Sequence, residues 1–197
     1  EPRVEFYRHM DAANVDLKGF TEAFYAELCA AHLEPVKDTL RYLRHETDVW
    51  FEITNLLIPG KNDSDGEIDA MTRWVVDALG PDVPMHFTAF HPDYKMLDVP
   101  PTPPATLTRA RSIALRNGVR YAYTGNVFDM AGGSTRCHAC GALLIERDWY
   151  ELGDYRLTAD GRCPDCGTRI PGVWAAMPGT WGRRRLPIRL EAAAGRA

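Results

Sequence analysis

The sequence lacks any hydrophobic run long enough to cross a membrane. No apolar stretch approaches the roughly 20 residues that a membrane-spanning helix needs. The first residues, Glu1-Pro2-Arg3-Val4-Glu5, also lack the pattern of a signal peptide. We therefore expect a cytoplasmic protein with no membrane contact.

An excess of positive charge is also missing. The formal net charge is -4, so the overall electrostatics give no reason to expect nucleic acid as a partner. The remaining composition is that of a globular protein, with 45% apolar and 25% charged residues among 197. This length predicts one sizeable domain with room for a small second module.

Strand and helix patterns alternate over the first 120 residues or so. Buried-strand patterns occupy residues 12–17, 49–58, 85–90 and 121–124. Helical spacing occupies residues 36–43, 68–79 and 107–117. Because parallel strands need crossover connections, this alternation predicts an α/β fold with a parallel sheet. The pattern does not separate an open sheet from part of a barrel.

The helix at residues 68–79 has the clearest boundaries. Ser64 and Glu67 stand three residues apart, as in a capping box, and Gly80-Pro81 ends the helix. The proline-rich stretch from Asp93 to Pro104 follows the strand at 85–90. We expect it to form a loop at the carboxyl edge of the sheet, where α/β proteins usually bind ligands.

Four of the five cysteines form two Cys-x-x-Cys pairs, at Cys137 and Cys140 and at Cys163 and Cys166. A glycine follows each pair and permits the tight turn that directs two thiolates at one ion. The spacing predicts a structural zinc site without an open coordination position. Iron in a rubredoxin-like site, two disulfides and four free thiols are the alternatives.

Short strands at residues 142–147 and 155–158 would join the two pairs into a ribbon. Some 35 residues bury too little surface to fold alone, so we expect the metal to order the ribbon. His138 lies inside the first pair and is interpreted as a solvent-facing spacer. The lone Cys29 is interpreted as a buried or half-buried thiol in an apolar stretch.

Charged residues occur at the ends of the expected strands. Asp16 and Lys18 are two positions apart, so they point to the same face of a strand, and Glu52 and Thr54 repeat this relation. His91 follows the third strand. These groups are either solvated strand ends or parts of a ligand site, and their residue types alone do not name the ligand.

The combined motifs resemble radical S-adenosylmethionine enzymes. Within these, the chain is similar to the AmmeMemoRadiSam proteins, which look like pyruvate formate-lyase activating enzymes with an added ribbon. The resemblance covers nearly all of residues 1–174. It rests on the two cysteine pairs and on four segments, which are Asp11–Lys18, Ile58–Asp63, His86–Lys95 and Tyr123–Asn126.

This resemblance implies a partial (β/α)6 barrel in which a [4Fe-4S] cluster reduces S-adenosylmethionine to a 5'-deoxyadenosyl radical. The radical would abstract hydrogen from a protein or small-molecule substrate. By the same resemblance, Lys18 contacts the methionine carboxylate, Asp16 helps to hold a cation near it, and His91 approaches the nucleoside. Thr54 stands where the activating enzymes carry an arginine.

The resemblance also implies partners. These are Memo-type and AMMECR-type proteins and an electron donor such as flavodoxin or ferredoxin. A glycyl radical protein would be a substrate only by analogy.

The cluster motif of the family, Cys-x-x-x-Cys-x-x-Cys, is absent from this sequence. We therefore expect the chain to be the C-terminal portion of such an enzyme and inactive alone. Residues 1–131 would be barrel, residues 132–174 the four-cysteine zinc ribbon, and residues 175–197 a mobile basic tail.

A different class of function is a zinc-ribbon module that binds protein or nucleic acid. Its support is the run Arg183-Arg184-Arg185 with Trp174 and Trp181 near the ribbon. The net charge and the lack of interleaved basic and aromatic residues on the expected ribbon strands argue against nucleic acid.

Overall fold

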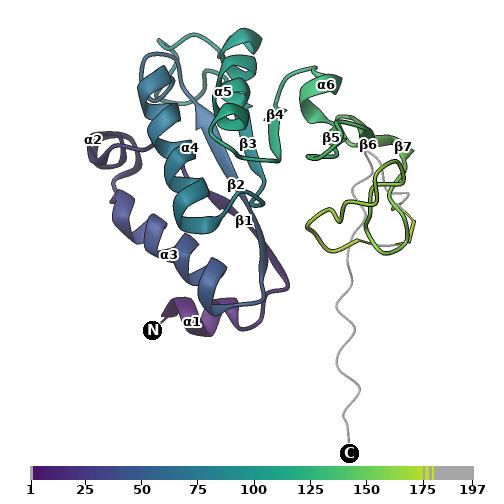
Figure 1. Ribbon diagram of the computed structural model, residues 1–197. Helices are drawn as coiled ribbons and strands as arrows, with labels where there is room; N and C mark the ends of the chain where they lie inside the picture. Colours follow the sequence, from purple (N-terminus) through teal and green to yellow (C-terminus); the bar gives the residue numbers. More distant parts are fainter. Residues whose placement is uncertain (1, 175, 178, 180–197) are drawn as a thin grey trace, which may run out of the picture.

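The computed structural model describes residues 2–174, 176, 177 and 179 (Figure 1). It contains a four-stranded sheet in the order β1-β2-β3-β4 and a three-stranded sheet in the order β5-β6-β7. All neighbours in the first sheet pair in parallel, so the predicted α/β class with a parallel sheet is confirmed. The predicted tail lies almost wholly outside the described residues.

The strands of the first sheet are β1 (Ala12–Asp16), β2 (Trp50–Leu57), β3 (Met85–Ala89) and β4 (Ala122–Gly125). The long helices between them are α3 (Leu33–Glu46), α4 (Asp65–Leu79) and α5 (Pro104–Arg116). The shorter helical elements are α1 (Pro2–Tyr7), α2 (Glu22–Phe24), the π-helix η1 (Tyr25–Cys29) and α6 (Met130–Gly133). The sequence patterns did not indicate these shorter elements.

Helix α4 begins with half of the predicted capping box. The Ser64 hydroxyl accepts a hydrogen bond from the Glu67 amide at 3.3 Å. The Glu67 carboxylate, however, accepts from the backbone amide of Phe20 at 2.6 Å. Glu67 therefore connects the start of α4 to the loop after β1.

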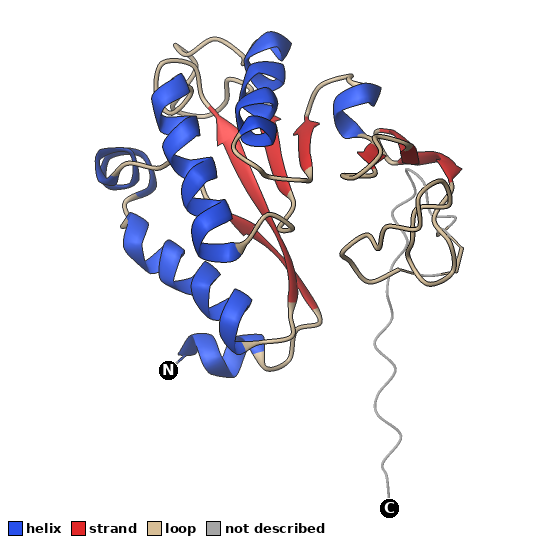
Figure 2. Ribbon diagram, viewed as in Figure 1, coloured by secondary structure: helices blue, strands red, loops and turns tan. Residues whose placement is uncertain are grey.

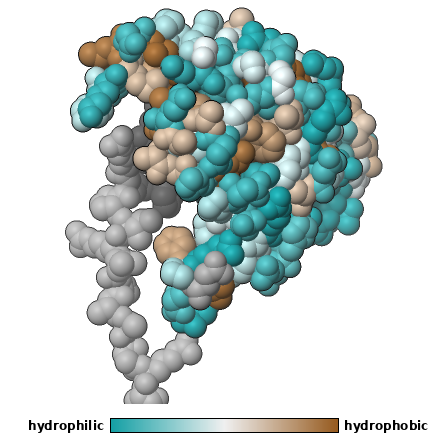
Figure 3. Space-filling view, turned by 90° about the vertical axis from the view of Figure 1, so that its left-hand side faces the viewer, coloured by the Kyte–Doolittle hydropathy of each residue, from teal (hydrophilic) through white to brown (hydrophobic). Residues whose placement is uncertain are grey.

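The three long helices lie on one face of the parallel sheet (Figure 2). Side chains on β2 alternate between buried and half-buried positions, and the buried set faces the helices. The core between sheet and helices includes the fully buried Leu40, Ile53, Ile68, Phe87 and Leu107. The side of the molecule that carries these helices has a mostly hydrophilic surface, with apolar patches at its upper left edge (Figure 3).

The opposite face of the sheet carries polar side chains. We call this surface the polar face, and its members are Asn14, Asp16, Glu52, Thr54, His86, Thr88 and Tyr123. Each of them is half-buried or exposed. The helices thus leave one side of the sheet to polar chemistry.

The second sheet consists of β5 (Thr135–Arg136), β6 (Leu143–Asp148) and β7 (Glu151–Tyr155). We call residues 132–174 the cysteine module. The predicted strand at 142–147 corresponds to β6, but the strand predicted at 155–158 was wrong, because β7 ends where that prediction begins. Only Trp149 and Tyr150 separate β6 from β7, so the partner strand starts earlier than the apolar pattern indicated.

None of the helices in the described ranges is long and apolar enough to cross a membrane. The longest, α4, has 15 residues.

Candidate functional site

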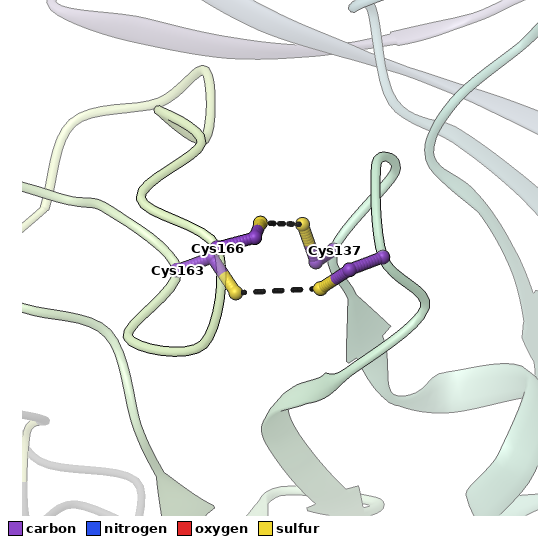
Figure 4. Close-up of side chains that lie close together, drawn as sticks. Cys137, Cys163 and Cys166 are labelled. Atoms are coloured by element: carbon purple, nitrogen blue, oxygen red, sulfur yellow. Dashed lines mark hydrogen bonds between the residues drawn. The ribbon is translucent and has the colours of Figure 1, made fainter.

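The four paired cysteines meet at one point of the cysteine module. Their sulfur atoms all lie within 4.8 Å of one another, although the two pairs are far apart in sequence. Figure 4 shows the two turns facing each other, with the Sγ atoms of Cys137 and Cys166 3.6 Å apart. The Sγ atoms of Cys140 and Cys163 are 3.7 Å apart. All four cysteines are free, so disulfides are not formed in this structure.

The two turns that present the thiols have the same backbone geometry. In each turn the glycine amide donates to the carbonyl of the first cysteine at 2.9 Å, from Gly141 to Cys137 and from Gly167 to Cys163. The φ angles of Gly141 and Gly167 are 77° and 73°, a region that favours glycine. The glycines are therefore needed for these turns, as the sequence predicted.

The sulfur positions fit a tetrahedral metal ion. Four sulfurs at the Zn–S distance of about 2.3 Å form a tetrahedron with edges of roughly 3.8 Å. The two measured cross-pair distances, 3.6 and 3.7 Å, match this edge. Hydrogen bonding with Thr168 lowers the pKa of Cys166, whereas the other three thiols raise the pKa of Cys140, so the case for a metal rests on the sulfur positions.

His138 is not the solvent-facing spacer that the sequence indicated. Its ring is half-buried, and its Nδ1 lies 2.7 Å from the hydroxyl of Tyr121, at the start of β4. Tyr121 itself is only 4% exposed and packs in the small core of the cysteine module. The first cysteine turn therefore lies directly against the parallel sheet.

Asp16 and Lys18 form an ion pair at the carboxyl end of β1. The Lys18 Nζ lies 3.0 Å from the Asp16 Oδ2, and both side chains remain partly open to solvent. Leu17 between them is fully buried on the opposite face. Such a pair contributes little to stability because water screens it, so it can be opened by a ligand carboxylate.

His91 lies at the same carboxyl edge, two residues beyond β3, and its side chain is exposed. Strand β2 separates it from β1. Among the described residues, the structure therefore joins Asp16 to Lys18 and leaves His91 without a direct contact to either. Thr54, which is paired with Asp16 across the strands, donates its hydroxyl proton to Asn14 at 2.9 Å.

A second polar group on this face was found only in part from the sequence, which indicated Glu52 but not its contact with His86. The His86 Nε2 lies 2.6 Å from the Glu52 Oε2, and the indole of Trp50 donates to the other carboxylate oxygen at 3.3 Å. The His86 ring stacks on Tyr123 with centroids 5.1 Å apart. Only the inter-strand register brings these residues together, and no short motif carries that information.

This group connects the sheet to the cysteine module. The Tyr123 hydroxyl lies 2.9 Å from the Thr135 hydroxyl, to which Arg147 also donates at 2.6 Å. A cavity of about 460 Å³ separates the two parts, with Glu52 and His86 on one wall and Arg147 and Trp174 on the other. The polar groups that line this cavity largely satisfy one another. We therefore assign them to the contact between the sheet and the cysteine module and not to a ligand site.

Cys29 is half-buried, as the sequence predicted. Burial raises the pKa of its thiol, and nearby Lys18 opposes this effect. A raised pKa disfavours the reactive thiolate, which agrees with a packing role.

No family model matches this chain. The uncharacterized protein MJ0808 of Methanocaldococcus jannaschii is 44% identical over 162 residues, which cover 82% of this chain and 48% of that protein. The chain thus spans about half the length of this curated relative.

A solved structure has a similar fold. It is the crystal structure of a domain of pyruvate-formate lyase-activating enzyme from Bacteroides vulgatus, with a TM-score of 0.55. The match has 18% sequence identity and covers 63% of this chain and 73% of that chain. At this identity the likeness shows the fold.

The Glu52–His86 contact predicts a pH-dependent contribution to stability. The hydrogen bond with His86 lowers the pKa of Glu52 below its ordinary value of 4.5. A lowered folded-state pKa stabilises the protein above the unfolded value, and this stability is lost as pH falls through the folded value. We expect Glu52→Gln to lower the free energy of unfolding at pH 7 by up to about 1 kcal/mol.

The loss should shrink toward zero near pH 3, as measured by urea denaturation across the pH range. The exposed Glu46→Gln serves as the control and should show no such loss at pH 7. An equal loss for Glu52→Gln at both pH values would contradict an ionic role for Glu52.

Proposed function

We propose that this chain is the C-terminal portion of a radical S-adenosylmethionine enzyme of the activating-enzyme type. The observation that carries the proposal is the Asp16–Lys18 pair at the carboxyl end of β1, on the polar face of a sheet that is similar to an activating-enzyme domain. Carboxyl edges of parallel strands are where α/β proteins bind their ligands. The motifs shared with the AmmeMemoRadiSam proteins add to this support.

In the proposed site, the ammonium of Lys18 binds the methionine carboxylate of S-adenosylmethionine. An exposed ammonium at 3.0 Å from Asp16 suits this role, because the incoming carboxylate can take over part of that contact. Asp16 then remains beside the ligand to attract a cation, and His91 faces the nucleoside. The [4Fe-4S] cluster, when bound, supplies the electron that cleaves S-adenosylmethionine.

The cluster ligands would belong to a part of the full-length protein outside these 197 residues. Two observations support this division. The chain spans about half of its curated relative, and β1 is an edge strand of the described sheet. Unpaired edge groups are a ready site for another strand. We propose that preceding strands pair with β1 and complete a partial (β/α)6 barrel around the polar face.

The cysteine module would be a zinc ribbon. Four thiolates fill a tetrahedral site and leave no position for a substrate, so the metal would be structural. Besides two of the cysteines, the module's own buried core consists of Leu144, Ile145, Leu157 and Ile170, with Tyr121 packed against them from the residue before β4. So small a core supports the view that the metal orders it.

A role of the cysteine module in binding a protein partner is a second candidate. Trp149 and Tyr150, at the tip of the β6–β7 hairpin, are 49% and 69% exposed. They line a shallow cavity of about 200 Å³ together with Asn126 and Met130, which follow the carboxyl end of β4. Exposed aromatic residues beside the carboxyl edge of the sheet suit a protein interface.

The charge of this hairpin argues against nucleic acid. Its carboxylates are Glu146, Asp148, Glu151 and Asp154. Acidic groups repel a phosphate backbone. Memo-type or AMMECR-type proteins and an electron donor such as flavodoxin or ferredoxin are the partners that we propose.

The metal proposal predicts one zinc ion per chain. Cys163→Ser should remove it and destabilise the cysteine module, because Cys163 is 1% exposed in the module's core. Cys29→Ser is the control and should keep the metal. Elemental analysis of both variants measures this, and visible absorption of the native protein distinguishes iron from zinc. Full metal retention in Cys163→Ser would refute the site.

The enzyme proposal predicts about four irons and one zinc in the full-length protein purified without oxygen. Lys18→Met should weaken S-adenosylmethionine binding at least tenfold, because it removes a charge-assisted contact. Arg116→Met is the control, because Arg116 is the last residue of α5 and lies away from the carboxyl edge of the sheet. Iron, sulfide and zinc counts test the metal content, and calorimetry tests the affinity. Zinc without iron would exclude the proposed enzyme activity.

The partner proposal predicts that a Trp149→Ala, Tyr150→Ala double variant loses affinity for a recombinant Memo-type or AMMECR-type protein. Truncation of two interface aromatics commonly costs at least tenfold in affinity. Tyr94→Ala provides the control, since Tyr94 is 79% exposed on the loop after β3. Equal binding by both variants would exclude the hairpin as the contact.

A further inference from the structure

The backbone of Lys18 is held by two buried side chains. Its amide donates to the hydroxyl of Tyr25 at 3.1 Å, and its carbonyl accepts from the Asn62 Nδ2 at 2.6 Å. Tyr25 and Asn62 are 3% and 2% exposed. The one residue whose ammonium we place on a ligand is therefore fixed at both of its backbone polar groups.

The residues that flank Lys18 are held in the same way. The Leu17 carbonyl accepts from the Asn55 Nδ2 at 2.7 Å, and the Phe20 amide donates to the Glu67 carboxylate at 2.6 Å. The holding side chains come from β2 and α4. Loop backbones usually bond to water or to their own turn, so this dense set of protein contacts needs an explanation.

These contacts are maintained at an energetic cost. Asn55 is 1% exposed, and its Oδ1 has no hydrogen-bond partner among the described residues. The Tyr25 hydroxyl is buried as well, and it accepts from the Lys18 amide. Apolar side chains would fill the same space without the cost of burying polar atoms. Polar residues in such positions indicate that the loop must have one conformation.

The local backbone is shaped to deliver Tyr25. Residues Tyr25–Cys29 form a single turn of π-helix, and Ala30 closes it with a left-handed φ of 48°. Insertions of this kind occur frequently at functional sites. Gly19 permits the ring of Phe24 to approach the backbone closely, because a Cβ at position 19 would lie 2.6 Å from that ring.

Asn62 also connects the ends of two strands. Its Oδ1 accepts from the Ile58 amide at 2.7 Å, and its Nδ2 donates to the Leu56 carbonyl at 2.9 Å as well as to Lys18. The end of β2 and the end of β1 are thus fixed relative to each other. Lys18 is held in register with the sheet and does not follow a mobile loop.

We infer that Tyr25, Asn55, Asn62 and Glu67 are positioning residues that aim Lys18 at the carboxylate of its ligand. This inference rests on the proposed function, because it takes S-adenosylmethionine as the ligand of Lys18. Among the four, Tyr25 can be tested with the least change to the packing, because Tyr25→Phe deletes one hydroxyl and keeps the buried ring. These four residues orient the Lys18 ammonium before the ligand binds, so less conformational freedom is lost on binding.

The test compares two ligands in the full-length protein with its cluster, by calorimetry without oxygen. S-adenosylhomocysteine keeps the amino-acid carboxylate, whereas 5'-methylthioadenosine lacks it. We expect Tyr25→Phe to weaken binding of S-adenosylhomocysteine about three- to tenfold. Binding of 5'-methylthioadenosine should be unchanged, which a general loss of structure would not allow.

Tyr121→Phe is the matched control, because Tyr121 is 4% exposed and its hydroxyl makes one hydrogen bond far from Lys18. Tyr121→Phe should lose about as much thermal stability as Tyr25→Phe but bind both ligands as the unchanged protein does. Asn55→Leu is a second variant, which removes the unpaired Oδ1 and leaves the Leu17 carbonyl unheld. It should weaken S-adenosylhomocysteine selectively as well.

The outcomes separate this inference from the proposed function. If Lys18→Met leaves S-adenosylhomocysteine binding unchanged, the proposed site itself is wrong. If Lys18→Met weakens binding but Tyr25→Phe and Asn55→Leu do not, only the positioning role is overturned. Equal weakening of both ligands by Tyr25→Phe would also overturn it, because the effect would then be general.

Discussion

The structure depends on one constraint, which is that the parallel sheet is covered by helices on one face. Each crossover advances by one strand in the same direction, so connections of a single handedness place α3, α4 and α5 on the same side. The other face cannot be left apolar in contact with water. Its polar side chains and the cavity between it and the cysteine module follow from this arrangement.

The polar face contains two sites of different character. At the carboxyl end of β1, the Asp16–Lys18 pair is open to solvent and is supported from beneath by buried side chains such as Tyr25. Farther across the sheet, His86 bonds to Glu52 and stacks on Tyr123, whose hydroxyl meets Thr135 of the cysteine module. Groups that already satisfy one another suit an interface, whereas an exposed ammonium on a rigid backbone suits a ligand.

Local patterns predicted those parts of the fold that local physics determines. The alternation on β2, the Ser64 cap of α4 and the glycine turns beside the cysteines are visible in short stretches of sequence. The π-helix at Tyr25–Cys29 and the Glu52–His86 contact were missed, because both depend on packing and register. The strand predicted at 155–158 was wrong because a two-residue turn, not the apolar pattern, sets where β7 begins.

The cysteine site contacts the parallel sheet through side-chain hydrogen bonds. Tyr121 and Tyr123 are two positions apart, so both hydroxyls point to the side of the cysteine module, where they meet His138 and Thr135. The module has a small core that includes two of the four clustered thiols. The proposed metal would therefore also help to fix Arg147, whose guanidinium lies 5.7 Å from the ring centroid of Tyr123. A metal site with no open coordination position would thus still shape the face on which the proposed chemistry occurs.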